Sequence, residues 1–587
     1  MSSPELGARV GPDGTSFAVR APTAEAVWLC LFHDETERRV PMARDGAIWR
    51  ADVPGVGEGT RYGYRAGGPP PHDVAKLLVD PHATTLDRAF SYDMRLGERG
   101  VDTAVLVPKA VMTAPSLVTP LRPVFRHGRL IYEVNVRGFT MLHPDVPKVI
   151  RGTIAALAHP AVIGHLTKLG VDAVELMPIV AWIDERHLPP LGLRNAWGYN
   201  PVVPMALDPR LAPGGVAELR DTVATLRAHG IGVILDLVFN HTGESDEHGP
   251  TLSLRGLDDA VYARDGEGRL INDAGTGNTL DFANPAVRDL TLASMRHFVA
   301  TCGVDGFRFD LATVMARGPG FDTHAPIFAD IAADPLLADR VLIAEPWDTG
   351  PGGYQLGAFP PDWLEWNDRF RDDVRRFWRG DGSNGTLATR LSGSSEVFGD
   401  RATCSVNFIA AHDGFTLADT VAYAERHNHA NGEHNRDGHA HEVSWNNGAE
   451  GSCDDASVIE RRHADQRALL ATLFASRGTI MLTAGDEFGR SQRGNNNAYA
   501  QDNATTWLDW HGRDRQLEDY VADLSRQRRA AAAISDPAMR HDARWHRHDG
   551  GEMTQGDWDS SAGFAMTVGE VRLLVDRDAR SVTLETV

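Results

Sequence analysis

Arg308 and Asp310 stand two residues apart at the end of a short apolar run, residues 303–310. In a strand, residues i and i+2 point to the same face, so the arginine would lie beside the carboxylate. A neighbouring cation favours the ionised carboxylate, which is the form that a retaining glycosidase uses as its nucleophile. The alternative interpretation is a structural ion pair at the end of a strand.

Three more short apolar runs end in carboxylates or histidines, at residues 234–241, 342–348 and 408–414. Parallel β-barrels carry their chemistry at the carboxyl ends of the strands, so four such endings favour one catalytic face. Each single carboxylate could still be a salt-bridge residue. The polar residues at these endings are Asp236, His241, Glu345, His412 and Asp413.

In order and content, the four segments resemble the four conserved regions of the α-amylase superfamily, glycoside hydrolase family 13. The resemblance implies that Asp310 is the nucleophile, Glu345 the general acid and base, and Asp413 a carboxylate that holds sugar hydroxyls. The other positions that match are Arg308, His241 and His412, which position sugar and carboxylates, and Asp236 and Asn240, which are largely structural. We include Asp236 among the expected substrate-binding residues.

Breaking a glucosidic bond requires an acid at the leaving oxygen and a nucleophile on the opposite face of the ring. In retaining enzymes the two carboxyl groups lie about 5 Å apart. Glu345 must be protonated to act first, so we expect burial or neighbouring carboxylates to raise its pKa. Asp413 would add negative charge where the oxocarbenium ion develops.

Residues 195–201 read Asn-Ala-Trp-Gly-Tyr-Asn-Pro and are similar to the aromatic platform segment of debranching enzymes and isoamylases in that superfamily. Tyr199 is expected to stack on a glucose ring, because apolar sugar faces suit aromatic faces. A place in the core is the alternative. Candidate secondary platforms, with the core as an equal alternative, are Trp197, Trp347 and Trp366. Further resemblances to this group lie at 359–368, 427–438 and 484–499.

This closer resemblance implies a retaining hydrolase that cleaves α-1,6 branch points of glycogen, limit dextrin or a related branched α-glucan. Other enzyme interpretations are an isoamylase or pullulanase, an α-1,4-acting amylase and a glucanotransferase, which the catalytic carboxylates do not separate. A glucan-binding protein without catalysis is the interpretation from another class. The complete set Asp310, Glu345 and Asp413 argues against it.

The charge balance limits the partners of the chain. Its 587 residues include 59 Lys and Arg against 80 Asp and Glu, a net charge of −21 at pH 7. This balance disfavours nucleic acid and anionic membranes. No run reaches about 18 apolar residues, which excludes a membrane-spanning helix. The first residues lack the basic and apolar regions of a signal peptide, so the cytoplasm is the expected location.

Metal ligation and disulfides find little support in the sequence. The cysteines are far apart and form no CxxC pair, so buried reduced thiols are expected at Cys30, Cys302, Cys404 and Cys453. Histidines cluster between residues 427 and 441, where a metal site is conceivable. The surrounding Asn, Gly and Asp residues favour a solvated cleft loop instead. No loop has EF-hand spacing, and we expect no metal and no cofactor.

From residue 128 onwards, strand-like runs alternate with helical spacing. Val162, Ile163, Leu166 and Leu169 recur at helical intervals, and Gly170 can end that helix. Repeated βα units of this size predict a (β/α)8 barrel, in which long polar insertions would wall the substrate cleft. The largest insertions are residues 242–280 and 424–455.

The flanking segments have β character. Strand-like runs separated by Gly and Pro predict an N-terminal β-sandwich similar to the carbohydrate-binding-type module of debranching and branching enzymes. After about residue 535 the chain resumes strand-like runs, but this piece is short. The expected α/β architecture is a sandwich over 1–115, a linker over 116–127, the (β/α)8 TIM barrel over 128–535 and a short β domain over 536–587.

Overall fold

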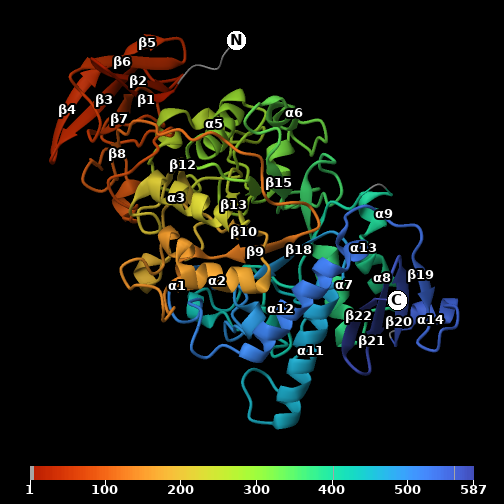
Figure 1. Cartoon of the computed structure of the whole chain (residues 1–587). Coiled ribbons are helices and arrows are strands. Elements are labelled where there is room, and N and C mark those ends of the chain that lie inside the picture. Colours follow the sequence, from red (N-terminus) through yellow and green to blue (C-terminus); the bar gives the residue numbers. More distant parts are fainter. Residues whose placement is uncertain (1–5, 401, 561, 587) are drawn as a thin grey trace.

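The computed structural model describes residues 6–400, 402–560 and 562–586, and its centre is a closed barrel of eight parallel strands (Figure 1). The predicted (β/α)8 barrel is confirmed. In order around the barrel the strands are β9 (Leu130–Val134), β10 (Ala173–Leu176), β13 (Gly232–Leu237), β14 (Gly306–Phe309), β15 (Val341–Ala344), β16 (Leu364–Asn367), β17 (Ser405–Asn407) and β18 (Thr479–Thr483), which pairs with β9.

The barrel strands are buried along their whole length, which explains their nearly continuous apolar runs. Helices cover their outer faces (Figure 1). The main helices are α2 (Pro160–Leu169), α3 (Gly215–Ala228), α5 (Pro285–Cys302), α6 (Pro326–Ala333), α7 (Asp368–Arg379), α8 (Asn384–Leu391), α11 (Ala456–Phe474) and α12 (Arg515–Ala530). Short ones are α1 (Val136–Thr140), α4 (Leu254–Leu257), α9 (Ser395–Phe398), α10 (Leu417–Thr420) and α13 (Ala532–Ser535).

The ends of α2 and α5 follow local rules. Gly170 ends α2 at a φ of 70°, and its N–H donates to the carbonyl oxygens of Leu166 and Thr167. Asn284 caps the start of α5, where its side-chain oxygen accepts from the N–H of Ala286 at 3.0 Å. The end of α2 is the one that the sequence predicts, and both caps depend on neighbouring residues alone.

The segment predicted as a linker closes the amino-terminal end of the barrel. Phe125 is buried with barrel-interior residues such as Ile131 and Ile343. The N–H groups of Val124 and Phe125 donate to Oδ2 of Asp305, at 2.9 and 3.3 Å. Asp305 directly precedes β14, so this anchor lies at the end of the barrel opposite to the carboxyl ends of the strands.

Two four-stranded antiparallel sheets precede the barrel and form one hydrophobic core with residues such as Phe17, Leu29 and Tyr64. They lie at one end of the molecule, beside α5 and β12 (Pro201–Leu207), which pairs with β11 (Val180–Trp182) (Figure 1). The strand order in the first sheet is β1 (Gly7–Gly11), β2 (Gly14–Arg20), β6 (Ile48–Pro54) and β5 (Ala43–Asp45). The strand order in the second sheet is β4 (Thr36–Pro41), β3 (Ala26–His33), β7 (Arg61–Gly67) and β8 (Ala110–Val111).

A third antiparallel sheet follows the barrel and packs on its helices. It consists of β19 (Arg544–His546), β20 (Gly563–Val568), β21 (Val571–Asp576) and β22 (Ser581–Thr586), with α14 (Gln555–Asp559) beside α8. Its buried residues Phe564 and Leu573 belong to the same hydrophobic cluster as Phe377 of α7 and Leu470 of α11. The short C-terminal sheet therefore shares its core with the barrel.

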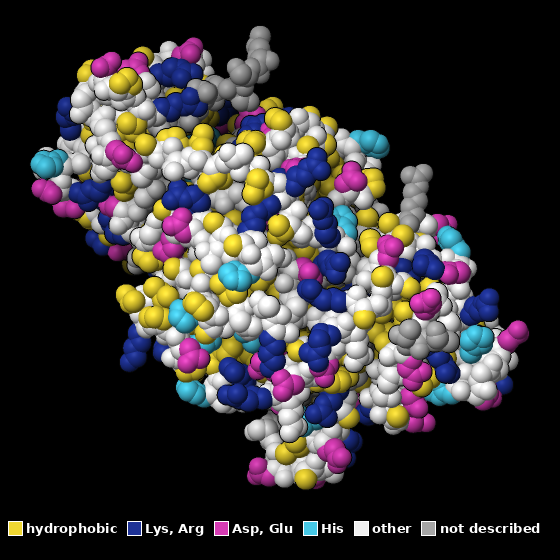
Figure 2. Space-filling model, in the orientation of Figure 1, with side chains coloured by type: hydrophobic (Ala, Val, Ile, Leu, Met, Phe, Trp, Pro, Cys, Tyr) yellow, Lys and Arg dark blue, Asp and Glu magenta, His cyan; other side chains and the backbone are white. Residues whose placement is uncertain are grey.

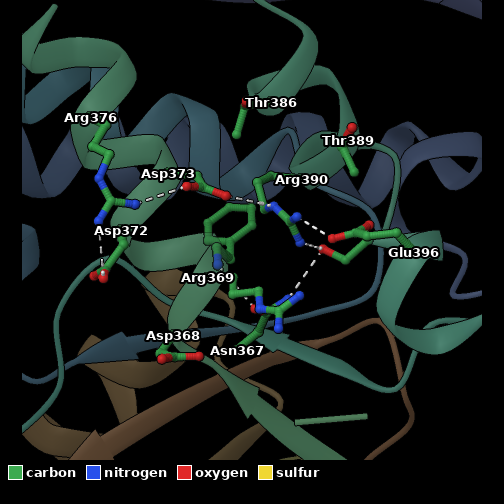
Figure 3. A network of polar contacts seen from close by, with 12 residues as sticks. Asn367, Asp368, Arg369, Asp372, Asp373, Arg376, Thr386, Thr389, Arg390 and Glu396 are labelled. Carbon is green, nitrogen blue, oxygen red and sulfur yellow. Dashed lines mark hydrogen bonds and ion pairs between the residues drawn. The ribbon is translucent and has the colours of Figure 1, made fainter. Parts of the chain in front are cut away.

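Ion pairs join α7, α8 and α9, which follow strand β16 in the chain (Figure 3). Asp373 lies between two arginines, 3.1 Å from Arg376 and 3.0 Å from Arg390. Arg390 also contacts Glu396. Asn367, the last residue of β16, caps α7 by accepting from the N–H of Phe370 at 3.0 Å. These contacts fix the carboxyl end of β16 relative to its helices.

One strand differs from the prediction. The apolar run 408–411 was expected to be a strand that ends at His412 and Asp413, but the strand is β17 and the run follows it. The strand itself is polar: Asn407 donates to Oγ of Ser476 and to the carbonyl oxygen of Arg477, both at 2.9 Å. Apolar periodicity misses a strand whose inner polar groups are paired, so that expectation was wrong.

Acidic, basic and apolar side chains are interspersed over the face that Figure 2 shows. Within the described residues, no helix is both long and apolar enough to span a membrane.

Candidate active site

A cleft of about 730 Å³ opens at the carboxyl ends of the barrel strands. Asp310, Glu345 and Asp413 all line it, and they come from the loops after β14, β15 and β17. The two long insertions, residues 242–280 and 424–455, contribute other parts of its wall. Three carboxylates that are far apart in the sequence therefore share one cavity.

Asp310 is held from two sides. Nη1 of Arg308 lies 3.2 Å from its Oδ1, as the i, i+2 spacing predicts. Nδ2 of Asn240 donates to its Oδ2 at 2.6 Å and to its carbonyl oxygen at 2.9 Å. A carboxylate with two such donors has a fixed direction, and only 13 % of the Asp310 side chain is exposed.

Arg308 is fully buried and joins several acidic groups. Nη1 lies 2.9 Å from both carboxylate oxygens of Asp236, its neighbour in register on β13. Nη2 lies 3.0 Å from Oε2 of Glu345. The indole of Trp366 lies below the guanidinium, 4.4 Å from ring centroid to Cζ. A buried arginine of this kind is stable only because it is paired on several sides.

Glu345 is positioned by backbone and charge together. The N–H of Leu311 donates to its Oε2 at 2.7 Å, and its side chain is almost completely buried. Burial raises the pKa of the Glu345 carboxyl to about 8. Arg308 opposes this rise, and the negative charges of Asp310 and Asp413 add to it. Near neutral pH the carboxyl group is therefore protonated, as a general acid requires.

Asp413 has the opposite environment. Burial acts to raise its pKa, but a hydrogen bond with His439 and the charge of His412 hold the pKa of Asp413 well below its usual range. Nε2 of His439 lies 3.4 Å from Oδ2 of Asp413. Asp413 and Glu345 thus differ in protonation within one cleft, which suits a division between acid and charge stabiliser.

His412 directly precedes Asp413 and is bound to the barrel. Its Nδ1 lies 2.7 Å from Oε1 of Glu133 on β9. Burial acts to lower the pKa of His412, but the charge of Glu133 outweighs it and raises this pKa to about 9. His412 is therefore a cation near neutral pH, and the fixed ring can donate only from Nε2 to a ligand.

Tyr199 forms an aromatic wall of the cleft with His412. Their rings are stacked, with centroids 4.8 Å apart and planes at 22°. The Tyr199 hydroxyl donates to Asp236, and its carbonyl oxygen lies 3.0 Å from Nε2 of His241. Trp197 stands edge-on to His412 at 5.0 Å. All of these except Asp236 line the cleft.

Some expected substrate-binding residues lie below the cleft surface. Asp236 is 2 % exposed and Trp366 is 1 % exposed, and neither lines the cleft. Both contact Arg308 instead, so the structure gives them supporting positions. Trp347 is half-buried and packs against the barrel interior. Of the predicted platforms, Tyr199 and Trp197 are the aromatic rings that face the cavity.

Two polar loops hold His439 in place. Nδ2 of Asn496 donates to the carbonyl oxygen of His439 at 3.0 Å and to Oε1 of Glu442 at 3.1 Å. Nδ2 of Asn428 donates to Oδ1 of Asn496 at 2.8 Å. Oε2 of Glu442 also pairs with the buried Arg375 at 3.0 Å. The insertion 424–455 is thus built onto the loop that contains residues 494–497.

Sequence reasoning singled out neither Glu133 nor Tyr92, and it gave His439 no individual role. Glu133 had a usable signal, because it is a carboxylate near the end of a strand-like run. His439 had been grouped with nearby histidines, yet His427 pairs with Glu450 at 3.0 Å and His439 turns to Asp413. In the described part of the chain, no three His, Cys, Asp or Glu side chains gather closely enough to hold a metal ion.

Known proteins resemble this chain at several levels. Residues 5–83 match carbohydrate-binding module 48, the isoamylase N-terminal domain. A glycogen debranching enzyme of Yersinia enterocolitica is 46% identical over 594 residues, covering 96% of this chain and 88% of the relative. One of Serratia proteamaculans is 45% identical over 573 residues, covering 93% and 86%.

Solved structures show the same fold at lower identity. A type I pullulanase of Bacillus subtilis, complexed with maltose, has a TM-score of 0.74 at 22% identity, over 98% of this chain and 79% of the other. A pullulanase of Anoxybacillus, complexed with maltotetraose, has a TM-score of 0.70 at 23% identity, over 98% and 81%.

Proposed function

Since this chain belongs to the family of glycogen debranching enzymes, we propose that it hydrolyses α-1,6 branch points of glycogen or of phosphorylase-limit dextrin. The observation that carries the proposal is that Arg308 contacts both Asp310 and Glu345. The carboxylate of Asp310, which is held in one direction, and the carboxyl of Glu345, whose pKa is raised, therefore lie in one cleft. One guanidinium between two carboxyls is compatible with the separation of about 5 Å that a retaining mechanism requires.

In the first step, the Glu345 carboxyl donates its proton to the glycosidic oxygen of the branch point. Asp310 attacks the anomeric carbon from the opposite face, the C–O bond breaks, and the main chain leaves as an alcohol. The branch is then an ester of Asp310. Nδ2 of Asn240 and Nη1 of Arg308 keep the attacking carboxylate in position.

In the second step, the Glu345 carboxylate takes a proton from water while the water oxygen attacks the anomeric carbon. The ester bond to Asp310 breaks, and the short chain leaves with the α configuration retained. Asp413 stays ionised and stabilises the positive charge that develops on the sugar in both steps. His412 faces the cleft as a hydroxyl-binding group, and Tyr199 supports one glucose ring. His241 also lines the cleft, but its two ring nitrogens already contact Asn240 and Tyr199.

The alternative activities within the superfamily use the same carboxylates, so they can be told apart only by the substrates that the protein cleaves. The test is to incubate purified protein with limit dextrin, native glycogen and linear amylose, and to measure the lengths of the released chains. Release of maltotetraose or maltotriose from limit dextrin with little product from amylose supports the proposal. Rapid depolymerisation of amylose would replace it with an α-1,4 activity. The cytoplasm stays the predicted location.

A further inference from the structure

Tyr92 lines the catalytic cleft although it comes from the segment that connects strands β7 and β8 of the N-terminal sheets. It lies beyond residues 5–83, which match the carbohydrate-binding module. The Tyr92 side chain is half-buried and packs against the core of the N-terminal sheets. The same side chain also forms part of the cleft wall. Packing on one side fixes the ring, so little freedom is lost when a ligand covers the other side.

The backbone around Tyr92 is docked onto the insertion 242–280. A short 3-10 helix, Met94–Leu96, follows Tyr92, and the carbonyl oxygen of Leu96 accepts from the N–H of Thr251 at 3.2 Å. Nζ of the buried Lys76 donates to the carbonyl oxygen of Arg95 at 2.9 Å. These contacts connect Tyr92 to a wall of the cleft on one side and to the N-terminal module on the other.

The module itself is attached to the same insertion. The carbonyl oxygen of Val79 accepts from Oγ of Ser253 at 2.8 Å, and the N–H of Val79 donates to the carbonyl oxygen of Leu252 at 2.8 Å. Arg20 pairs with the buried Asp258 at 2.6 Å. Because the module and the insertion are joined along several residues, Tyr92 has a defined position relative to the barrel.

One charged side chain, Arg186, lines the same cleft as Tyr92. Arg186 makes two hydrogen bonds to Asp246, at 2.8 and 2.6 Å. Burial raises the pKa of Tyr92, the charge of Arg186 opposes that rise and the charge of Asp246 adds to it. An aromatic face beside paired charged groups suits a sugar, which offers an apolar ring face and a rim of hydroxyls.

We propose that Tyr92 and Arg186 form an outer glucose-binding position of the cleft, in which Tyr92 stacks on a glucose unit of the α-glucan and Arg186 donates to its hydroxyls. The N-terminal module thereby takes part in substrate binding at the catalytic cleft. This inference rests on the proposed action on a branched α-glucan. It concerns the binding of the chain and leaves the bond-breaking groups unchanged.

The experiment compares Tyr92→Ala, Tyr92→Leu and Tyr92→Phe on limit dextrin, with Met94→Ala as the control. Met94 is 71% exposed, lies two residues further along and does not line the cleft. We expect Ala and Leu to raise KM about three- to tenfold with kcat unchanged, the range that loss of one aromatic contact gives. Phe keeps the flat ring and should keep the KM of the unchanged protein.

Leu separates stacking from packing, because it fills the space against the N-terminal core without offering a flat face. If Tyr92→Ala raises KM but Tyr92→Leu has the KM of the unchanged protein, Tyr92 is a packing residue and the proposal is overturned. Equal KM values for all variants, or an equal rise in Met94→Ala, overturn it too. Thermal unfolding of each variant shows whether a change in KM follows from a loss of stability.

Binding must also be measured without turnover, so that failure of the proposed reaction can be told apart. In an Asp310→Asn background, affinity electrophoresis in gels containing limit dextrin should show weaker retardation for Tyr92→Ala than for Met94→Ala. A protein that binds the dextrin through Tyr92 but hydrolyses no branch contradicts the proposed function alone. A protein that releases branches but binds equally with and without Tyr92 contradicts this inference alone.

Discussion

Nη2 of Arg308 lies 3.0 Å from Oε2 of Glu345, while Nη1 of the same guanidinium lies 3.2 Å from Oδ1 of Asp310. One buried cation therefore contacts both the proposed nucleophile and the proposed acid. Arg308 opposes the rise in the pKa of Glu345, but burial still raises this pKa to about 8. The protonation of Glu345 thus depends on burial more than on the arginine.

The Asp310→Asn variant should lose activity by several powers of ten while it folds normally. The amide keeps the shape, and its single oxygen can still accept from Asn240 or from Arg308, but it cannot form the glycosyl ester. Initial rates on limit dextrin and a thermal unfolding curve check this. More than a few per cent of the activity in pure protein would make Asp310 a structural partner of Arg308.

The Glu345→Gln variant should depend on the leaving group. A sugar alkoxide leaves poorly without a proton, whereas fluoride leaves without help. The variant should therefore be inactive on limit dextrin but still consume an α-glycosyl fluoride that fits the cleft. A glycosyl ester should accumulate, because the same residue activates water in the second step, and mass spectrometry of the protein detects it.

An equal loss on both substrates would assign Glu345 to sugar binding. Asp413 would then be the next candidate for the acid, although its depressed pKa argues against that role.

The pH profile of kcat/KM should have an alkaline limb near pH 8. The first step needs protonated Glu345, whose pKa is raised to about 8, so the active fraction falls as pH rises through that value. The limb belongs to the coupled group of carboxyls, not to Glu345 alone. Initial rates between pH 5 and 9 on limit dextrin give the profile, and a limb near pH 4.5 would contradict the raised pKa.

The same shift affects stability. The pKa of Glu345 in the folded protein lies above its usual value of 4.5. The contribution of Glu345 to the free energy of unfolding is therefore fully present below about pH 4.5 and is lost as pH rises towards 8. In Glu345→Gln, the decrease in unfolding free energy over that range should be smaller. Urea unfolding at pH 4.5 and pH 8 measures the difference, and identical pH dependence in both proteins would count against it.

Replacing Arg308 should cost both stability and activity. Arg308→Ala leaves the buried carboxylate of Asp236 without its cation, at a cost of about 3–5 kcal/mol. Arg308→Lys keeps the charge but loses the fork that reaches three carboxylates, so it should fold better than Ala and remain poorly active.

The control is Arg376→Ala, because Arg376 forms its ion pair with Asp373 at a half-exposed site, worth about 0–1 kcal/mol. Urea unfolding and initial rates report on all three variants. If Arg308→Ala were no less stable than the control, the pairing of buried charges would not be what stabilises the site.

The His439→Ala variant should lower kcat/KM about tenfold, the cost of one hydrogen bond to a charged group. The ring contacts Asp413 and keeps its pKa low, so its loss frees the carboxylate that stabilises developing charge. His439→Gln retains an N–H donor and should recover much of the rate. His427→Ala is the matched control, because His427 belongs to the same insertion but pairs with Glu450. Equal rates in all three variants would make His439 a bystander.

The order of the barrel elements, the ends of α2 and α5 and the Arg308–Asp310 contact could all be predicted from the sequence. Each depends on neighbours along the chain: a run of apolar residues, a capping residue or an i, i+2 spacing. The strand β17 could not, because its polar residues Ser405 and Asn407 are satisfied by partners from other strands and loops.

By itself, the sequence determined which side chains to propose as catalytic: Asp310, Glu345 and Asp413 stand in segments that local pattern and resemblance both single out. Only the tertiary structure decided which groups surround them. The Arg308–Glu345 contact, the hydrogen bond from His439 to Asp413 and the entry of Tyr92 into the cleft wall join segments that are distant in the chain. Burial and pairing across strands set pKa values and positions, and neither has a periodicity that a single sequence reveals.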